Sequence, residues 1–258
     1  MLLAVDVGNT NTVFAVFDDT GRMLGEWRSS TNANRTADEH GVWLAQLFAL
    51  KGIDRRAITH GIIASVVPAT LFSLRRMFRA YFDCTAKVVG GPDVDIGIRV
   101  LLDRPEEVGA DRLVNALAAF EEYGGPKIIV DFGTATTFDV IDEEGSYLGG
   151  AIAPGVNLSL EALHLASAQL PRVAIGRPDR AVGKTTVQAM RSGIYWGYIG
   201  MIEGMIARIR EELGGPVGVI STGGLAPLFS ECSSVLALSD PQLTLKGLYA
   251  VHRRNISR

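Results

Sequence analysis

Two acidic turns in this chain have the residue types that bind phosphate and a metal ion. They are Asp6-Val7-Gly8-Asn9-Thr10-Asn11-Thr12-Val13 in the first half and Asp131-Phe132-Gly133-Thr134-Ala135-Thr136-Thr137 in the second. Glycine lets a backbone approach a ligand closely, and successive turn amides form a concavity that binds an anion. A carboxylate is a hard oxygen ligand for the magnesium that accompanies a nucleotide. Each aspartate could also make an Asx turn with its own backbone, but two matching copies favour ligand binding.

A second candidate for chemistry is Gly109-Ala110-Asp111-Arg112, at the start of a predicted helix. Asp111 could accept the proton of an attacking hydroxyl while Arg112 holds an anionic part of the acceptor. Acidic residues are also favoured in a first helical turn by the helix dipole, and Arg112 could merely pair with a neighbouring carboxylate. The residues alone leave both interpretations open.

Other glycine motifs are less informative. Thr222-Gly223-Gly224 follows a buried strand and could contact a nucleotide or form a tight turn. Gly183-Lys184-Thr185 resembles the end of a P-loop, but its spacing from Gly176 and the intervening Pro178 are wrong for one. Thr185 and Thr186 are better explained as the start of the next helix.

The elements around these motifs alternate between strand and helix. Each acidic turn lies between apolar strands and is followed by a third strand, so the chain contains a duplicated architecture. Hydrophobic periodicity predicts helices over 37–52, 69–82, 109–123, 156–168, 186–213 and 243–253, and strands over 61–67, 86–89 and 217–221. This pattern predicts two α/β domains side by side. Facing copies in two domains would place Asp6 and Asp131 on opposite walls of one cleft.

Composition excludes several classes of function. The 258 residues carry a formal net charge of −3, so no global basic field attracts nucleic acid or anionic lipid. Two cysteines and four scattered histidines are too few and too far apart for a disulfide framework or a zinc site. The N-terminus has no signal-peptide pattern, and the apolar run over 62–72 is too short to span a membrane, so we expect a cytoplasmic protein.

Five motifs together identify a family. They are Asp6–Asn11, Gly109–Arg112, Asp131–Thr137, Gly149–Gly155 and Thr222–Gly224, with Leu170-Pro171 and the closing 240–248 segment also matching. In this order they resemble the type III pantothenate kinases of the acetate kinase/sugar kinase/Hsp70/actin superfamily. The resemblance implies two duplicated ribonuclease H-like (actin-like ATPase) domains, each a mixed sheet flanked by helices. We expect residues 1–124 to carry the first phosphate loop and the acceptor segment, and residues 125–258 the second phosphate loop.

The resemblance also implies roles for single residues. The ATP contacts are Asp6, Val7, Gly8, Asn9, Thr10, Asn11, Thr12, Val13 and Thr134. The pantothenate contacts are Gly109, Ala110, Asp111, Arg112 and Thr186, with Asp111 as the catalytic proton acceptor. Asp6 would serve magnesium and Asp131 a monovalent cation, potassium or ammonium. The implied protein is a homodimer that converts pantothenate to 4′-phosphopantothenate, at the entry to coenzyme A biosynthesis.

Two alternatives are compatible with the same motifs. One is a superfamily kinase with another small acceptor, which the segment around Asp111 disfavours. The other is a non-catalytic regulatory accessory protein of the same family, which the intact Asp6, Asp111 and Asp131 disfavour. One departure concerns the acceptor site, because Leu102 stands where many members of the family carry tyrosine.

Overall fold

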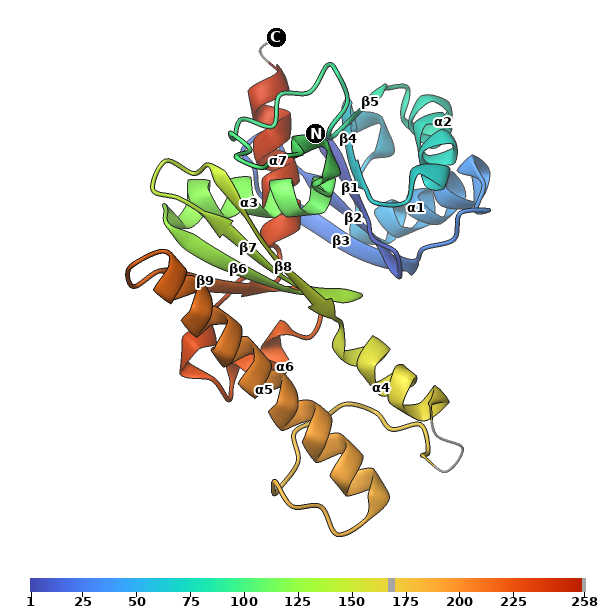
Figure 1. Cartoon of the computed structure of the whole chain (residues 1–258). Coiled ribbons are helices and arrows are strands. Elements are labelled where there is room, and N and C mark those ends of the chain that lie inside the picture. The colour runs from blue at the N-terminus through green and yellow to red at the C-terminus, as the bar shows by residue number, and fades with distance from the viewer. Residues whose placement is uncertain (167–169, 257–258) are drawn as a thin grey trace. The chain divides into compact units, whose positions relative to one another are not determined.

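The computed structural model describes residues 1–166 and 170–256, which divide into two compact units (Figure 1). Unit 1 contains Met1–Arg99, Asp103–Glu121 and the C-terminal segment that begins at Leu243. Unit 2 contains Val100–Leu102 and Glu122–Gln242. The units therefore differ from the expected division at residue 124, chiefly because the last helix packs in unit 1.

Unit 1 is built on a five-stranded sheet in the order β3-β2-β1-β4-β5. Its strands are β1 (Leu2–Val7), β2 (Asn11–Phe17), β3 (Met23–Ser30), β4 (His60–Ser65) and β5 (Ala86–Val88). The first three strands form an antiparallel meander, while β4 and β5 run parallel to β1. Parallel pairing places the carboxyl ends of β1 and β4 at the same edge of the sheet.

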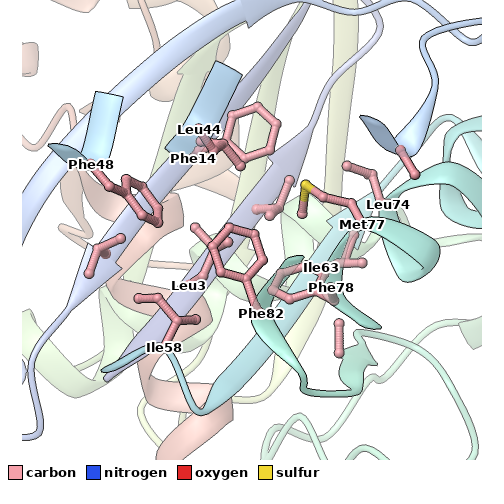
Figure 2. Packing of buried hydrophobic residues seen from close by; sticks show 14 of the residues in the cluster. Leu3, Phe14, Leu44, Phe48, Ile58, Ile63, Leu74, Met77, Phe78 and Phe82 are labelled. Atoms are coloured by element: carbon pink, nitrogen blue, oxygen red, sulfur yellow. The ribbon is translucent and has the colours of Figure 1, made fainter. Parts of the chain in front are cut away.

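Helices cover both faces of this sheet because β1 is apolar on both sides. Leu3 and Val5 belong to the cluster shared with α1 (Ala37–Lys51) and α2 (Leu71–Phe82), which contains Phe48 and Phe78 (Figure 2). The alternate residue Leu2 packs with residues of α3 (Ala110–Tyr123) and α7 (Leu243–Ile256) on the other face. Residues of alternating orientation along one strand thus contribute to two cores.

Two local signals set the ends of α1. Thr36 and Glu39 form a capping box, in which each side chain accepts a hydrogen bond from the other residue's backbone N–H. Gly52 ends the helix in the left-handed conformation, with φ of 70°. The predicted helix over 37–52 is confirmed at both ends.

Unit 2 repeats the same design with the order β10-β9-β6-β7-β8. Its strands are β6 (Lys127–Phe132), β7 (Ala135–Ile141), β8 (Tyr147–Pro154), β9 (Gly218–Thr222) and β10 (Leu238–Ser239). Its helices are α4 (Val156–Leu165), the long α5 (Thr186–Glu212) and the short α6 (Ala226–Ser230). Val130 and Phe138 pack with Tyr195, Ile202 and Phe229 in the core beneath α5 and α6.

The two acidic hairpins differ by one residue in the length of their loops. Asp6 pairs with Val13 across the first hairpin, whereas Asp131 pairs with Thr137 across the second. The second loop is therefore one residue shorter, and any residue-by-residue comparison of the two turns shifts by one after the glycine.

The remaining predicted elements lie close to their expected positions. The structure adds α6, β10 and four short 3-10 helices (η1 Arg55–Ala57, η2 Pro68–Thr70, η3 Pro105–Glu107, η4 Ser234–Leu236) that were not predicted. The predicted end of the 156–168 helix lies outside the described residues. Within the described residues, no helix combines the length and apolar character needed to cross a membrane.

Candidate active site

The first acidic loop connects the two central antiparallel strands of unit 1. Asp6 is half-buried near the carboxyl end of β1, and Asn9, Thr10 and Asn11 are exposed at the tip. The Gly8 N–H donates to the carbonyl of Asn11 at 2.9 Å, which closes the loop. A methyl group added at Gly8 would lie 3.3 Å from that carbonyl oxygen, so the backbone is already tightly packed. The exposed tip and the carboxylate at its base have the form expected of a phosphate-binding turn.

The Asp111 segment lies beside the neighbouring strand end in the same unit. Val66, just after β4, donates its N–H to the carbonyl of Val7 at 3.0 Å. A methyl group added at Gly109 would lie 3.6 Å from Cγ1 of Val66. Val66 therefore contacts both the end of β1 and the start of α3. The structure thus brings the first acidic loop and Gly109–Arg112 to adjacent strand ends.

The start of α3 fixes Asp111 locally. One carboxylate oxygen of Asp111 accepts from the Arg112 N–H at 2.9 Å, and the Gly109 carbonyl accepts the N–H groups of Arg112 and Leu113. A methyl group at Gly109 would lie 2.5 Å from the Asp111 carboxylate, so glycine is the residue that leaves room for this geometry. Asp111 is half-buried at this helix start.

Two side-chain hydroxyls hold the turn between β4 and the 3-10 helix η2. Ser65 Oγ accepts from the Val67 N–H at 3.0 Å and donates to the Val67 carbonyl at 3.1 Å. Thr70 Oγ1 also donates to the Val67 carbonyl, at 2.8 Å. These bonds fix the position of Val66, and neither hydroxyl was predicted to matter.

The second acidic loop, which lies in unit 2, is packed against two glycines. Asp131 pairs with Thr222 of β9, which places Gly223 next to its side chain. Gly223 has φ of +89°, and a methyl group there would lie 2.5 Å from the Asp131 carboxylate. Gly155 donates its N–H to the carbonyl of Thr134 at 3.1 Å. The structure therefore assembles Asp131, Thr134 and the Thr222-Gly223 turn around one strand end.

The end of β8 is held in place for this contact by α5. Tyr198 donates its hydroxyl to the carbonyl of Pro154, directly before Gly155, and also contacts the Ser159 hydroxyl at 3.1 Å. Burial raises the pKa of Tyr198, so the hydroxyl stays protonated as a donor. Its position on a helix 44 residues away along the chain gave no signal in the sequence.

Thr186 lies apart from the Asp131 loop within unit 2. It is exposed at the first position of α5, where Thr185 accepts from the Gln188 N–H at 3.2 Å as the N-cap. Figure 1 shows this end of α5 extending beyond the sheet of unit 2. In residues 1–166 and 170–256, no hydrogen bond joins Thr186 to the Asp131 loop.

Asp6 and Asp131 are carboxylates, which is the donor type that magnesium prefers. No group of three or more His, Cys, Asp or Glu side chains in the described part of the chain could hold a metal ion. Magnesium in nucleotide sites is commonly bound by one or two carboxylates together with phosphates and water. Each acidic loop offers one carboxylate, Asp6 in the first and Asp131 in the second.

Comparison with known proteins gives one family along most of the chain. The family model described as type III pantothenate kinase matches residues 2–208. The type III pantothenate kinase of Rhodospirillum rubrum is 66% identical over 255 residues, covering 99% of this chain and 99% of that protein. That of Paramagnetospirillum magneticum is 62% identical over 256 residues, covering 99% and 98%.

A solved structure supports the fold. The activator of the 2-hydroxyisocaproyl-CoA dehydratase from Clostridium difficile, with bound ADPNP, has a TM-score of 0.56 at 12% identity and covers 99% of this chain and 96% of its own. At this identity the likeness concerns the fold alone. The predicted fold of two ribonuclease H-like domains of the actin-like ATPase type is confirmed, since each unit has a mixed five-stranded sheet flanked by helices.

Proposed function

The chain belongs to the type III pantothenate kinase family, and we propose from this premise how its residues divide the work of the reaction. The protein is an ATP-dependent kinase that converts pantothenate to 4′-phosphopantothenate, the first step of coenzyme A biosynthesis. The observation that carries this function is the 66% identity to a type III pantothenate kinase across 99% of both chains.

The two acidic loops bind ATP in this proposal. Backbone N–H groups of the first loop, Asp6 to Val13, cradle phosphate oxygens, and Thr134 of the second loop adds a further contact. The tight packing around Gly8 and the positive φ of Gly223 support this role, because both leave backbone rather than side chain facing a ligand. The proposed division of labour keeps the first phosphate loop and acceptor segment in residues 1–124 and the second loop in residues 125–258.

The Gly109–Arg112 segment binds and orients the acceptor. The terminal hydroxyl oxygen of pantothenate forms a bond to the γ-phosphorus while the bond from that phosphorus to the β-phosphate bridging oxygen breaks, releasing ADP. The hydroxyl proton passes to the Asp111 carboxylate. Arg112 holds the pantothenate carboxylate, and Thr186 is a further acceptor contact. The proximity of Gly109 to Val66, and of Val66 to the end of β1, supports this arrangement because acceptor and phosphate segments meet at one sheet edge.

Two cations complete the proposed site. Magnesium, held by Asp6 directly or through water, neutralises charge on the phosphates when it is bound. Asp131 serves a monovalent cation, potassium or ammonium. The chemistry of the donors supports both, because each loop offers a carboxylate. In the second loop, the Phe132 carbonyl oxygen and the Asp131 carboxylate both lie against Gly223.

We also propose a homodimer located in the cytoplasm. Several large apolar side chains of α4 and α5 in unit 2 are exposed, including Leu158, Leu165, Val187 and Trp196. Apolar surface of this kind is typical of an interface that a second copy covers. Sedimentation of the purified protein would test this part of the proposal.

The central experiment is a turnover assay with pantothenate, ATP and magnesium, with and without potassium. Asp111→Asn should lower kcat at least about a hundredfold while ATP binding survives, because the proton acceptor is lost. Asp54→Asn is a matched control, since Asp54 caps a short 3-10 helix of the same unit through the Arg56 N–H and asparagine keeps that cap. Phosphorylation of a different acceptor alone, or equal turnover by Asp111→Asn and the wild type, would contradict the proposal.

A further inference from the structure

We propose that Thr31 is a positioning residue that sets the backbone geometry of the first phosphate loop and thereby the affinity for ATP. This inference rests on the proposed function of that loop. Thr31 follows β3, 23 residues beyond Gly8, and it belongs to none of the acidic-turn motifs. Its role comes entirely from the β2–β3 hairpin, which returns it to the side of the loop.

Three hydrogen bonds join Thr31 to the loop. Its hydroxyl donates to the carbonyl of Gly8 at 2.7 Å, and its N–H donates to the carbonyl of Thr10 at 2.9 Å. The Thr12 hydroxyl lies 2.9 Å from the Thr31 hydroxyl. A hydroxyl has a single proton, and that of Thr31 is committed to Gly8, so Thr12 is the donor of this third bond.

These bonds determine which way the loop amides face. A trans peptide unit is planar, with its C=O and N–H pointing in opposite directions. Holding the Gly8 carbonyl toward Thr31 therefore directs the Asn9 N–H away from Thr31. Holding the Thr10 carbonyl in the same way directs the Asn11 N–H away as well. Two alternate amides of an exposed loop are thus turned to one side, which is the arrangement that binds an anion.

Among the residues that the structure describes, the second acidic loop has no counterpart of the hydrogen bond from the Thr31 hydroxyl, so this bond is specific to the first loop. The residue that follows β8 is Gly155, and its N–H donates to the carbonyl of Thr134 just as the Thr31 N–H donates to Thr10. A methyl group at Gly155 would overlap the Thr134 carbonyl and lie 2.9 Å from the carbonyl oxygen of Gly133. The shorter second loop closes onto backbone with no room for a side chain, whereas the longer first loop needs the Thr31 hydroxyl to reach Gly8.

The test compares Thr31→Val and Thr31→Ser. Valine has the shape of threonine but leaves the Gly8 carbonyl without its donor and the buried Thr12 hydroxyl without its acceptor. Serine keeps the hydroxyl. Thr20→Val is a matched control in the turn at the other end of the same hairpin, where the Thr20 hydroxyl donates to Asp18 at 2.6 Å.

We expect Thr31→Val to weaken ATP binding about tenfold, by both KM and calorimetry, because an unpaired carbonyl lets the loop rearrange. The KM for pantothenate should be unchanged. Thr31→Ser should stay within about twofold of the wild type. Thr20→Val should leave both KM values unchanged even where its melting temperature falls. Thr31→Ala serves in place of valine if that variant does not fold.

Equal ATP affinity in Thr31→Val and Thr20→Val would overturn the inference, as would a serine variant as impaired as the valine variant. A wild-type protein that binds ATP but does not phosphorylate pantothenate would instead refute the proposed function. Calorimetry with ATP alone still measures the effect of Thr31 in that case, so the two failures are distinguishable.

Discussion

Gly223 occupies a position that a single methyl group should disrupt. Its backbone has φ of +89°, and a Cβ there would lie 2.5 Å from the Asp131 carboxylate and 2.7 Å from both the N and O of Phe132. Two of these three atoms belong to the backbone of a central strand, so they cannot move aside cheaply. Gly223→Ala should therefore displace the end of β6 together with Asp131.

The expected magnitude follows from two separable terms. Placing alanine in the left-handed region destabilises by about 1–2 kcal/mol. Overpacking against a fixed backbone destabilises by roughly another 1–3 kcal/mol. Together they give about 2–5 kcal/mol, and at about 2–4 °C per kcal/mol for a chain of this size the melting temperature should fall by roughly 10 °C.

Gly214 provides the control that separates the overpacking term from the backbone term. It also has a positive φ, +74°, but a Cβ at this position would meet nothing within 4 Å. Gly214→Ala should lower the melting temperature by only about 2–8 °C through the backbone term. Scanning calorimetry of both variants, with titration of ATP into each, separates strain from damage to the Asp131 loop.

The contact argument requires a difference between the two variants. Only Gly223→Ala should lose ATP affinity and the proposed activation by a monovalent cation, because only its methyl group reaches Asp131. If the two variants have the same melting temperature and the same ATP affinity, the packing of Gly223 against Asp131 affects neither stability nor ATP binding.

Three further predictions follow from the same structure. Gly155→Ala should weaken ATP binding, measured by titration calorimetry, because its methyl group crowds the Thr134 carbonyl. Gly193→Ala is the control, since a Cβ at this position of α5 meets nothing within 4 Å. It should bind ATP normally and be at least as stable as the wild type. Burial lowers the pKa of both His40 and His252 from 6.5 to about 4. The contribution of the neutral side chains to stability is therefore complete above pH 6.5 and is lost as pH falls toward 4. The melting temperature of a His40→Leu/His252→Leu variant should depend less on pH across this window. Burial raises the pKa of the Cys84 thiol to about 11. Alkylation of Cys84 by iodoacetamide at pH 8 should therefore be about a hundredfold slower in the native protein than in urea. Equal rates would contradict the burial of this thiol.

The local elements of this protein follow from short stretches of sequence. The capping box at Thr36 and Glu39 and the glycine at position 52 specify α1 without help from distant residues. The first strand begins with a continuous apolar run, and its neighbouring residues Leu2 and Leu3 lie in different cores. These signals are legible because each depends on backbone conformation or on side-chain periodicity within a few residues.

The position of the last helix depended on contacts that no local signal encodes. Asn255 of α7 accepts from the Asp95 N–H at 3.0 Å and donates to the Asp95 carbonyl at 2.8 Å, while Thr244 donates to Asn115 at 2.7 Å. These bonds join residues more than a hundred positions apart. The helix itself was predictable, but its membership of unit 1 was decided by packing against α3 and β1.

The sequence by itself identified Asp6, Asp111 and Asp131 as candidates for this reaction, because each stands in a turn or at a helix start that neighbouring residues specify. Tertiary structure alone decided the contact of Val66 with the ends of β1 and α3, and the hydrogen bonds from Thr31 to the first loop. The physical reason is that strand register and side-chain neighbours are set by the summed packing of the whole sheet. The residues of a loop can therefore be recognised in the sequence, but the direction in which the loop amides point depends on the folded sheet.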